Sequence, residues 1–218
     1  MVLVLDESGS MSDLTRDTIG GFNSMIEKEK KLDVDAHVTT VLFNDQYKML
    51  YNRRELKDVS KMTDKDYTPG GMTALLDAVG RTIHKMDMVA GIHRKDKGNK
   101  VLFVIITDGE ENDSKEYTYA DVKKLIKDRQ ENAGWEFIFL GANIDAAAAA
   151  ENLGIDRDRA VKYKNTGSGV RANFKAVAEL SDSLAKSGRV SDRWKETVEK
   201  DEDDAADKQS AAVTSHRR

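Results

Sequence analysis

The chain alternates between short apolar runs and longer segments in which apolar residues recur at helical spacing. Largely apolar runs cover residues 2–5, 37–43, 101–107 and 136–140, and β-branched residues are frequent in the second of them. Runs of this length are typical of strands that are buried on both faces of a sheet. The run at 101–107 is apolar almost throughout, so we expect it to form a central parallel strand.

Between these runs, apolar residues recur every three or four positions, which predicts helices that pack one face on the sheet. The helices are expected at residues 14–26, 73–89, 119–132, 146–152 and 171–186, and a last short strand at 160–163. The alternation of strands and helices favours a doubly wound α/β fold, in which helices cover both faces of a mainly parallel six-stranded sheet.

One pair of strands departs from this alternation. The segment between residues 37–43 and 47–51 begins with an Asn-Asp pair, which indicates a β-hairpin, so one edge of the sheet is expected to be antiparallel. With that strand at the edge, we expect the sheet order 3-2-1-4-5-6. Further along, Pro69 followed by Gly70 predicts a type II turn ahead of the second helix.

The composition changes near the C-terminus. From about residue 195 the chain consists mainly of charged and polar residues, which cannot bury enough apolar surface to fold alone. We therefore assign residues 1–190 to a single domain and 191–218 to a charged, disordered tail. Trp194 could anchor the beginning of this tail.

Charge and composition exclude several classes of partner. The 35 basic and 39 acidic residues are mixed along the chain without a basic stripe, so nucleic acid is not expected as a partner. No apolar run approaches the roughly 18 residues needed to cross a bilayer, so no membrane association is expected. The chain has no cysteine, which excludes disulfides and thiolate metal sites. Together with the absence of a signal peptide before the first strand, this favours a cytoplasmic protein.

Five oxygen-bearing side chains are expected to meet at one edge of the sheet. Asp6 follows the first strand, Ser8 and Ser10 lie in the turn after it, and Asp108 follows the central strand. Thr73 lies on the loop at the start of the second helix. Because all parallel strands deliver their following loops to the same edge, three separate segments bring oxygen ligands to one place.

The chemistry of these ligands indicates a hard divalent cation. Carboxylate and hydroxyl oxygens suit Mg²⁺ or Mn²⁺, whereas zinc prefers His and Cys, so Mg²⁺ is the expected occupant. Mg²⁺ takes six oxygens at about 2.0–2.1 Å, and the five candidates include only two carboxylates. The ion is therefore left under-neutralised, and an acidic side chain from a partner could complete both its coordination and its charge balance.

These motifs resemble a known family. Asp6-x-Ser8-x-Ser10, Thr73 within Gly-Gly-Met-Thr, and Asp108 within Thr-Asp-Gly are similar, in order and in position, to the metal-ion-dependent adhesion site (MIDAS) of von Willebrand factor A-type (vWA) domains. The resemblance covers roughly residues 1–187. The chain looks most like the intracellular vWA proteins of bacteria and phages.

The resemblance implies roles for these residues. The two serines would coordinate the ion directly, while Thr73 and Asp108 would exchange between direct and water-mediated contact. A Glu or Asp of a protein partner would take the open position, and the last helix could shift when it binds. Intracellular relatives often work beside AAA+ ATPases or in assembly complexes, so the resemblance implies a partner of that kind.

Two other functions remain open. An Asp after a first strand also begins the haloacid dehalogenase-type phosphohydrolase pattern, which needs a second Asp two residues on as general acid. That position is Ser8, so a Mg²⁺-dependent phosphohydrolase is the weaker reading and we do not expect an enzyme. Alternatively, the metal could be purely structural, in which case the protein would supply every ligand.

Polar residues near the expected site have simpler roles. Asn143 or Asp145 could line the rim of the site, but we expect them to cap the alanine-rich helix that follows them. Acidic side chains in the neighbouring loops are expected to be solvated: Glu7, Glu110, Glu111 and Asp113.

Overall fold

A computed structural model describes residues 1–32, 35–92, 100–191 and 193–201. Within them, six strands form one sheet in the order β3-β2-β1-β4-β5-β6, as the sequence predicts. All neighbouring strands are parallel except β2 and β3, which form the antiparallel edge. The strands are β1 (Val2–Asp6), β2 (His37–Phe43), β3 (Tyr47–Glu55), β4 (Leu102–Thr107), β5 (Glu136–Gly141) and β6 (Ala160–Lys162).

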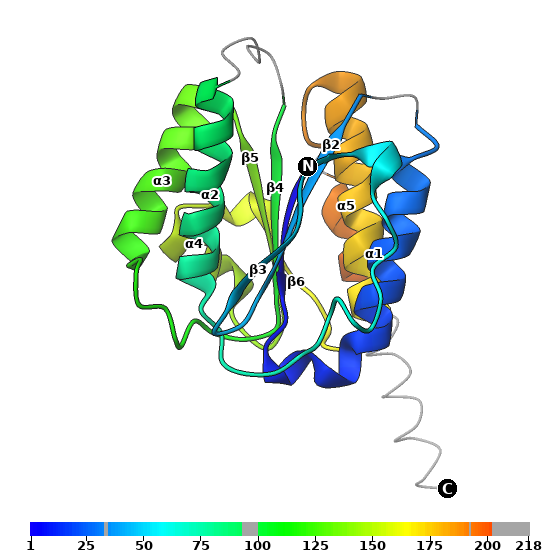
Figure 1. Ribbon diagram of the computed structural model, residues 1–218, viewed down its shortest axis with the longest axis horizontal. Coiled ribbons are helices and arrows are strands. Elements are labelled where there is room, and N and C mark those ends of the chain that lie inside the picture. Colours follow the sequence, from blue (N-terminus) through cyan, green and yellow to red (C-terminus); the bar gives the residue numbers. More distant parts are fainter. Residues whose placement is uncertain (33–34, 93–99, 192, 202–218) are drawn as a thin grey trace, which may run out of the picture.

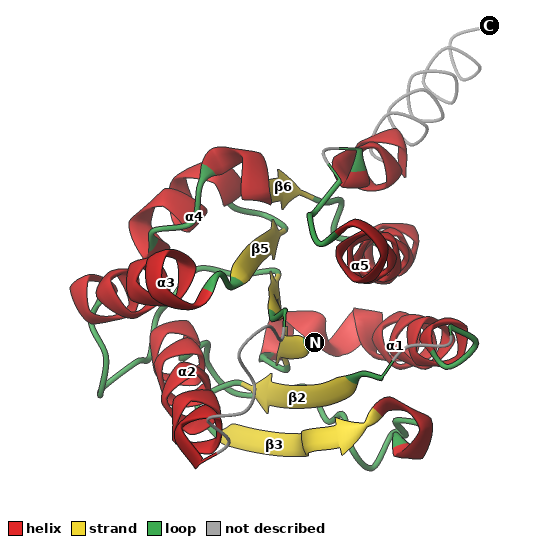
Figure 2. Ribbon diagram, turned by 90° about the horizontal axis from the view of Figure 1, so that it is seen from above, coloured by secondary structure: helices red, strands yellow, loops and turns green. Residues whose placement is uncertain are grey.

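Five labelled helices cover the two faces of this sheet. They are α1 (Thr15–Glu29), α2 (Leu75–Ile92), α3 (Tyr119–Ala133), α4 (Ala146–Leu153) and α5 (Gly167–Ser187), with a 3-10 helix at Gly9–Leu14 leading into α1. Figures 1 and 2 show α1 and α5 on one side of the sheet and α2, α3 and α4 on the other. The protein is therefore a three-layer α/β sandwich.

Side chains of the central strands alternate between the two layers of core. In β1, Leu3 and Leu5 pack towards α1 and α5, whereas Val2 and Val4 pack towards α2, α3 and α4. Both sets are buried, which explains why the strand is a continuous apolar run and lacks the alternation of a strand with one solvated face.

The hairpin forms where the sequence predicts it, and its outer strand is longer than expected. Asn44 closes the turn, because its Oδ1 accepts from the backbone N–H of Gln46 at 2.7 Å. β3 continues to Glu55, although its last residues, Asn-Arg-Arg-Glu, are polar. An edge strand exposes one side to water, and polar residues are compatible with that position.

Two expectations about local structure were wrong. The left-handed residue before α2 is Gly71, with φ of 73°, so Pro69 and Gly70 do not form the expected type II turn. Helix α5 begins at Gly167, four residues earlier than expected, because Thr166 caps it by accepting from the N–H of Gly169. The glycines of its first turn lack the apolar spacing that marks a helix in the sequence.

Part of the segment that was assigned to the tail is folded. Residues 194–201 are helical, and the side chains of Trp194 and Val198 are buried in the core on the α5 side of the sheet. The charged residues between them make this segment look disordered in the sequence. Two apolar side chains one helical turn apart are nevertheless enough to dock it on the domain. The rest of the expected tail, 202–218, lies outside the described residues.

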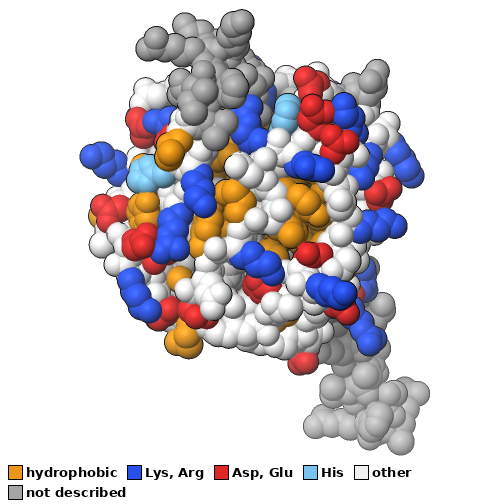
Figure 3. All heavy atoms as spheres, in the orientation of Figure 1, with side chains coloured by type: hydrophobic (Ala, Val, Ile, Leu, Met, Phe, Trp, Pro, Cys, Tyr) orange, Lys and Arg blue, Asp and Glu red, His pale blue; other side chains and the backbone are white. Residues whose placement is uncertain are grey.

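No helix in the described part of the chain is both long enough and apolar enough to span a membrane. The face drawn in Figure 3 carries basic and acidic side chains interspersed with one another, without a continuous basic stripe.

Candidate metal site

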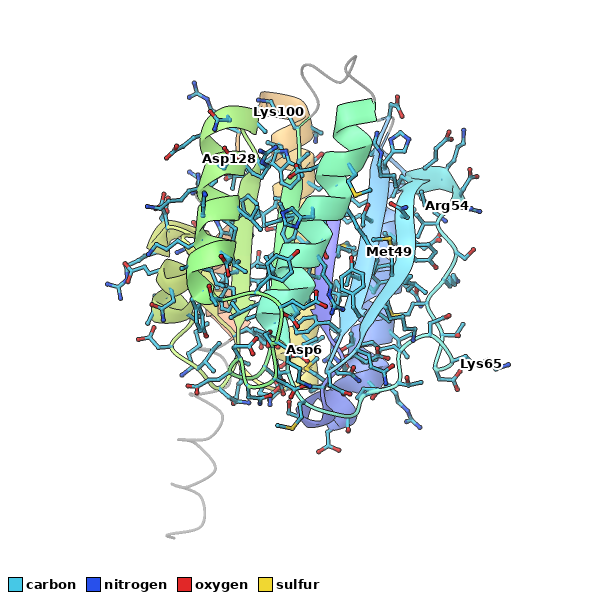
Figure 4. The ribbon with its side chains drawn as sticks, turned by 60° about the vertical axis from the view of Figure 1, so that its left-hand side comes forward. Asp6, Met49, Arg54, Lys65, Lys100 and Asp128 are labelled. Carbon is cyan, nitrogen blue, oxygen red and sulfur yellow. The ribbon has the colours of Figure 1, made fainter. Side chains whose placement is uncertain are left out.

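The five predicted residues converge at the edge where the parallel strands end, and we call them the oxygen cluster: Asp6, Ser8, Ser10, Thr73 and Asp108. Asp6 is the last residue of β1, and Asp108 directly follows β4, the strand beside it. Figure 4 shows Asp6 at this edge of the sheet, among the loops. Four members are almost fully buried, with 1–4% of their surface exposed, whereas Ser10 is exposed.

Short contacts between oxygens connect the members of the cluster. The hydroxyls of Ser8 and Ser10 are 3.1 Å apart, and the Ser10 hydroxyl donates to Asp108 Oδ1 at 2.6 Å. The Thr73 hydroxyl lies beside the turn that follows Asp108, because a Cβ placed on Gly109 would lie 3.8 Å from its oxygen. The structure thus brings together side chains from three segments of the chain, as predicted.

The Asp6 carboxylate is held by donors on both of its oxygens. Its Oδ1 accepts from the backbone N–H of Ser8 at 2.7 Å, and its Oδ2 accepts from the Thr107 hydroxyl at 2.5 Å. Burial raises the pKa of this carboxyl above its usual value, and the negative charge of Asp108 adds to the rise, while the hydrogen bonds from Thr107 and Ser8 oppose it. A nearby cation would relieve this cost of burying two carboxylates together.

Backbone contacts fix the loop that carries Thr73. The N–H of Thr73 donates to Asn112 Oδ1 at 2.8 Å, and its carbonyl accepts from the N–H of Asn112 at 3.0 Å. On the other side, the N–H of Gly9 donates to the carbonyl of Gly71 at 3.2 Å, which ties this loop to the turn that carries the two serines. Hydrogen bonds therefore hold the loops that carry the cluster in fixed positions relative to one another.

The spacing of the oxygens fits a six-coordinate ion. In an octahedral shell with metal–oxygen distances of about 2.1 Å, neighbouring oxygens lie about 3.0 Å apart. The Ser8–Ser10 and Ser10–Asp108 separations, 3.1 and 2.6 Å, bracket that value. No group of three or more His, Cys, Asp or Glu that could hold a metal is found in the described part of the chain. Among the described residues, the oxygen cluster offers a metal ion two carboxylates together with hydroxyl groups.

Two asparagines contact Asp108: Asn165, which was not predicted near the site, and Asn143, which was expected to cap a helix and only secondarily to line the rim. Asn165 Nδ2 lies 3.4 Å from Asp108 Oδ2, and Asn143 Nδ2 lies 3.4 Å from the Asp108 carbonyl. Asn143 has a φ of 56° and does not cap the following helix, contrary to expectation. Asp145 does cap it, accepting from the N–H of Ala148 at 3.0 Å. The one signal in the sequence for these asparagines was their position just after β5 and β6.

Glu7 and Glu111, expected to be solvated, instead hold the loops in place. Glu7 is buried, accepts from the backbone N–H and the hydroxyl of Thr68, and pairs with Lys48 at 3.7 Å. Glu111 accepts from the N–H of Leu76, in the first turn of α2, at 2.9 Å. An anion at a helix N-terminus interacts favourably with its free N–H groups and dipole. Both carboxylates therefore support the site without being part of it.

Solved structures with the same fold were found at low sequence identity. A von Willebrand factor type A protein from Catenulispora acidiphila matches with a TM-score of 0.57 and 15% identity, over 83% of this chain and 42% of that one. Proximal thread matrix protein 1 from the mussel byssus, with a zinc-occupied MIDAS motif, matches with a TM-score of 0.57 and 14% identity, over 83% and 47%. Manganese-loaded TRAP protein of Plasmodium vivax matches with a TM-score of 0.51 and 17% identity, over 69% and 60%.

At these identities the structural matches establish the fold alone, and the chain spans less than two thirds of each of those proteins. No curated protein sequence matches the chain. A family model described as the vWA domain found in the TerF C-terminus matches residues 1–161, which include the whole oxygen cluster and the sheet that positions it. The chain belongs to the TerF-like vWA family.

Proposed function

We propose that this protein is a metal-dependent protein-binding module, in which the oxygen cluster forms a MIDAS that captures an acidic side chain of a partner. One observation carries the proposal. Asp6, Ser8, Thr73 and Asp108 are closed off from solvent while Ser10 is exposed, so an ion bound among them would face the protein on one side and water on the other. A Glu or Asp of a partner protein could reach it from the water side.

The number of ligands supports an open coordination position. The cluster offers five side chains for the six positions of Mg²⁺, and two of them, Thr73 and Asp108, are the pair that the family resemblance allows to bind through water. We propose Mg²⁺ or Mn²⁺ as the resident ion. The manganese-loaded Plasmodium protein and the zinc-occupied mussel protein support a divalent cation, although the oxygen ligands here favour a harder ion than zinc.

We propose binding rather than catalysis. A phosphohydrolase of the type considered above needs a second acidic residue two positions after Asp6, and the group there is the Ser8 hydroxyl, which contacts the Ser10 hydroxyl. A purely structural metal is the other alternative. It would require all six positions to be filled by the protein, and the exposure of Ser10 argues against such a closed shell.

The proposal is tested with fluorescent peptides that carry a single Glu within an otherwise neutral sequence, and with the same peptides carrying Gln. We expect saturable binding of the Glu peptides in Mg²⁺, loss of that binding in EDTA, and no binding of the Gln peptides. Saturable Mg²⁺ binding without any preference for Glu over Gln would instead support a structural metal.

A further inference from the structure

Two exposed carboxylates lie beside the loop that carries Thr73, and we call them the acidic pair: Asp45 and Glu110. Asp45 lies in the turn of the β2–β3 hairpin, and Glu110 lies two residues after Asp108. Because β2 and β4 both run parallel to β1, the segments that follow them reach the edge of the sheet that holds the oxygen cluster. The acidic pair therefore lies next to the candidate metal site without belonging to it.

The turn that carries Asp45 is bonded to the Thr73 loop. The Nδ2 of Asn44 donates to the carbonyl of Gly70, on that loop, at 2.8 Å. A Cβ placed on Gly71 would overlap the carboxylate of Asp45, so this carboxylate lies directly against the backbone two residues before Thr73. The charge of Asp45 is therefore held beside the oxygen cluster.

The turn after β4 holds Glu110 against the same loop. A Cβ placed on Gly109 would lie 3.8 Å from the Thr73 hydroxyl oxygen, and Asn112 exchanges two hydrogen bonds with the backbone of Thr73. The neighbouring Glu111 accepts hydrogen bonds within the protein, whereas the side chain of Glu110 is exposed. A partner that approaches the metal ion therefore meets the charge of Glu110.

Basic side chains close to the acidic pair are already engaged. Lys115, on the loop after β4, pairs with Asp113 at 3.4 Å, and Lys48, at the start of β3, pairs with the buried Glu7 at 3.7 Å. Lys164 is half-buried on the loop after β6, on the side of the site away from the hairpin. Neither carboxylate of the acidic pair takes part in an ion pair within the described part of the chain. The side of the site nearest the hairpin is therefore negative.

Met72 adds an exposed apolar surface to this side of the site. Its side chain is 51% exposed, and it lies between Thr73 and Gly71, the glycine that contacts Asp45. The stem of a Lys or Arg side chain covers apolar surface while its charged end remains free to pair with an anion. A long basic side chain therefore matches both the apolar and the charged part of this surface.

We propose that the partner carries a Lys or Arg close in sequence to the Glu or Asp that it gives to the metal, and that this basic residue pairs with the acidic pair. This inference rests on the proposed function. The ion attracts a carboxylate at short range, whereas Asp45 and Glu110 repel it on approach. A partner with acidic residues alone is therefore disfavoured, and one with a basic neighbour beside its acid is favoured.

The test uses three fluorescent peptides with one central Glu in an otherwise neutral sequence. They differ at the residues two positions to either side of that Glu, which are Lys, Gln or Glu. Their affinities for the full chain are measured in Mg²⁺ at low and at high ionic strength. One variant of the chain carries Asp45→Asn with Glu110→Gln. A matched control carries Asp35→Asn with Glu131→Gln, two exposed residues towards the opposite edge of the sheet, so it undergoes the same change in net charge.

For the wild type we expect the Lys peptide to bind about tenfold more tightly than the Glu peptide at low ionic strength, and a smaller ratio in high salt, because exposed charges are screened. The variant of the acidic pair should bind the three peptides nearly alike, and the control should keep the wild-type preference.

Three results would contradict this expectation. Metal-dependent binding of the peptides with the same ratio of affinities in all three proteins would overturn the role of the acidic pair and leave the proposed function standing. A second Mn²⁺ bound by the wild type and lost in the variant would show that the acidic pair binds a cation of its own, which also overturns the inference. Failure of every peptide to bind the wild type in Mg²⁺ would overturn the proposed function as well.

Discussion

Thr107 Oγ1 donates a hydrogen bond to Asp6 Oδ2 at 2.5 Å, across 101 positions of sequence, and so joins the ends of two adjacent parallel strands. The other oxygen of Asp6 accepts a hydrogen bond from the backbone N–H of Ser8. An outer hydrogen bond of this kind orients a metal ligand without touching the ion. The geometry of the oxygen cluster is thus set by the sheet itself.

Replacing Thr107 with Val removes this hydroxyl and nearly preserves the shape of the side chain. We expect Thr107→Val to weaken Mn²⁺ binding by about 10- to 100-fold, the usual range for the loss of a residue that orients a metal ligand. Isothermal titration calorimetry measures the effect. The matched control is Thr82→Val, a buried threonine on α2 whose hydroxyl donates to the carbonyl of Ala78. An equal loss of affinity in both variants would refute the role of Thr107.

The loop that carries Thr73 contains two adjacent glycines, of which only Gly71 is constrained by its backbone conformation and its neighbours. Gly71 has a φ of 73°, and a Cβ there would lie 1.9 Å from Asp45 Oδ1, whereas a Cβ on Gly70 would meet nothing within 4 Å. We expect Gly71→Ala to lower the free energy of unfolding by about 1–2 kcal/mol and to weaken metal binding, because the left-handed conformation is strained for alanine. Gly70→Ala should leave both properties close to those of the wild type. Urea unfolding and a metal titration of the two variants check the contrast.

Asp77 ties the start of α2 to the loop before α3, and its ionisation should contribute to stability. Burial opposes ionisation, but N–H donors from Lys115, Glu116 and Tyr117 at 2.9–3.0 Å lower the pKa of this carboxyl below its usual value. Because the folded-state pKa is the lower one, the contribution is present above the unfolded value of about 3.9 and is lost as the pH falls through the folded pKa.

We therefore expect Asp77→Asn to lower the free energy of unfolding by about 2 kcal/mol at pH 7, since hydrogen bonds to a charged group are lost. The difference between the variant and the wild type should shrink when the pH falls below about 4. Urea unfolding at pH 7, 5 and 3.5 measures both effects. A difference that stays constant across this range would show that the charge of Asp77 is not responsible.

The docking of the helical segment 194–201 can be tested at Trp194. Its side chain is 1% exposed, and its indole N–H has no hydrogen-bond partner among the described residues. We expect Trp194→Ala to lower the free energy of unfolding by about 3–5 kcal/mol and Trp194→Phe to lower it clearly less, because burial of the ring carries the effect. An alanine variant as stable as the wild type in thermal unfolding would place this segment outside the folded domain.

Much of the fold was predictable because the sheet is buried on both faces. The continuous apolar run of β4 and the periodic apolar positions of the helices are direct consequences of that burial. Together with the Asn-Asp turn between β2 and β3, they predicted the strand order and the antiparallel edge correctly. The convergence of Asp6 and Asp108 followed from the same topology, since both are located at the ends of adjacent parallel strands.

Other features depend on contacts that single segments do not reveal. Glu7 resembles an ordinary solvated acid in the sequence, and its burial depends on Thr68 and Lys48, which approach it only in the folded chain. Asn165, just before the Thr166 cap of α5, contacts Asp108, and α5 begins four residues earlier than its apolar spacing indicates. The charged surroundings of Trp194 concealed a helix whose buried face consists of few residues. In each case a tertiary contact outweighed the local pattern.

The central claim is that the oxygen cluster holds one divalent cation through Asp6. The most direct test is a titration of Mn²⁺ into the EDTA-treated protein, with free Mn²⁺ followed by electron paramagnetic resonance, for the wild type beside Asp6→Asn. Asparagine keeps the size of the side chain and an oxygen for the Ser8 N–H, so the variant should fold. We expect one saturable site in the wild type, displaced by Mg²⁺, and at least a hundredfold loss of affinity in the variant. Equal affinity in the two proteins would contradict the claim.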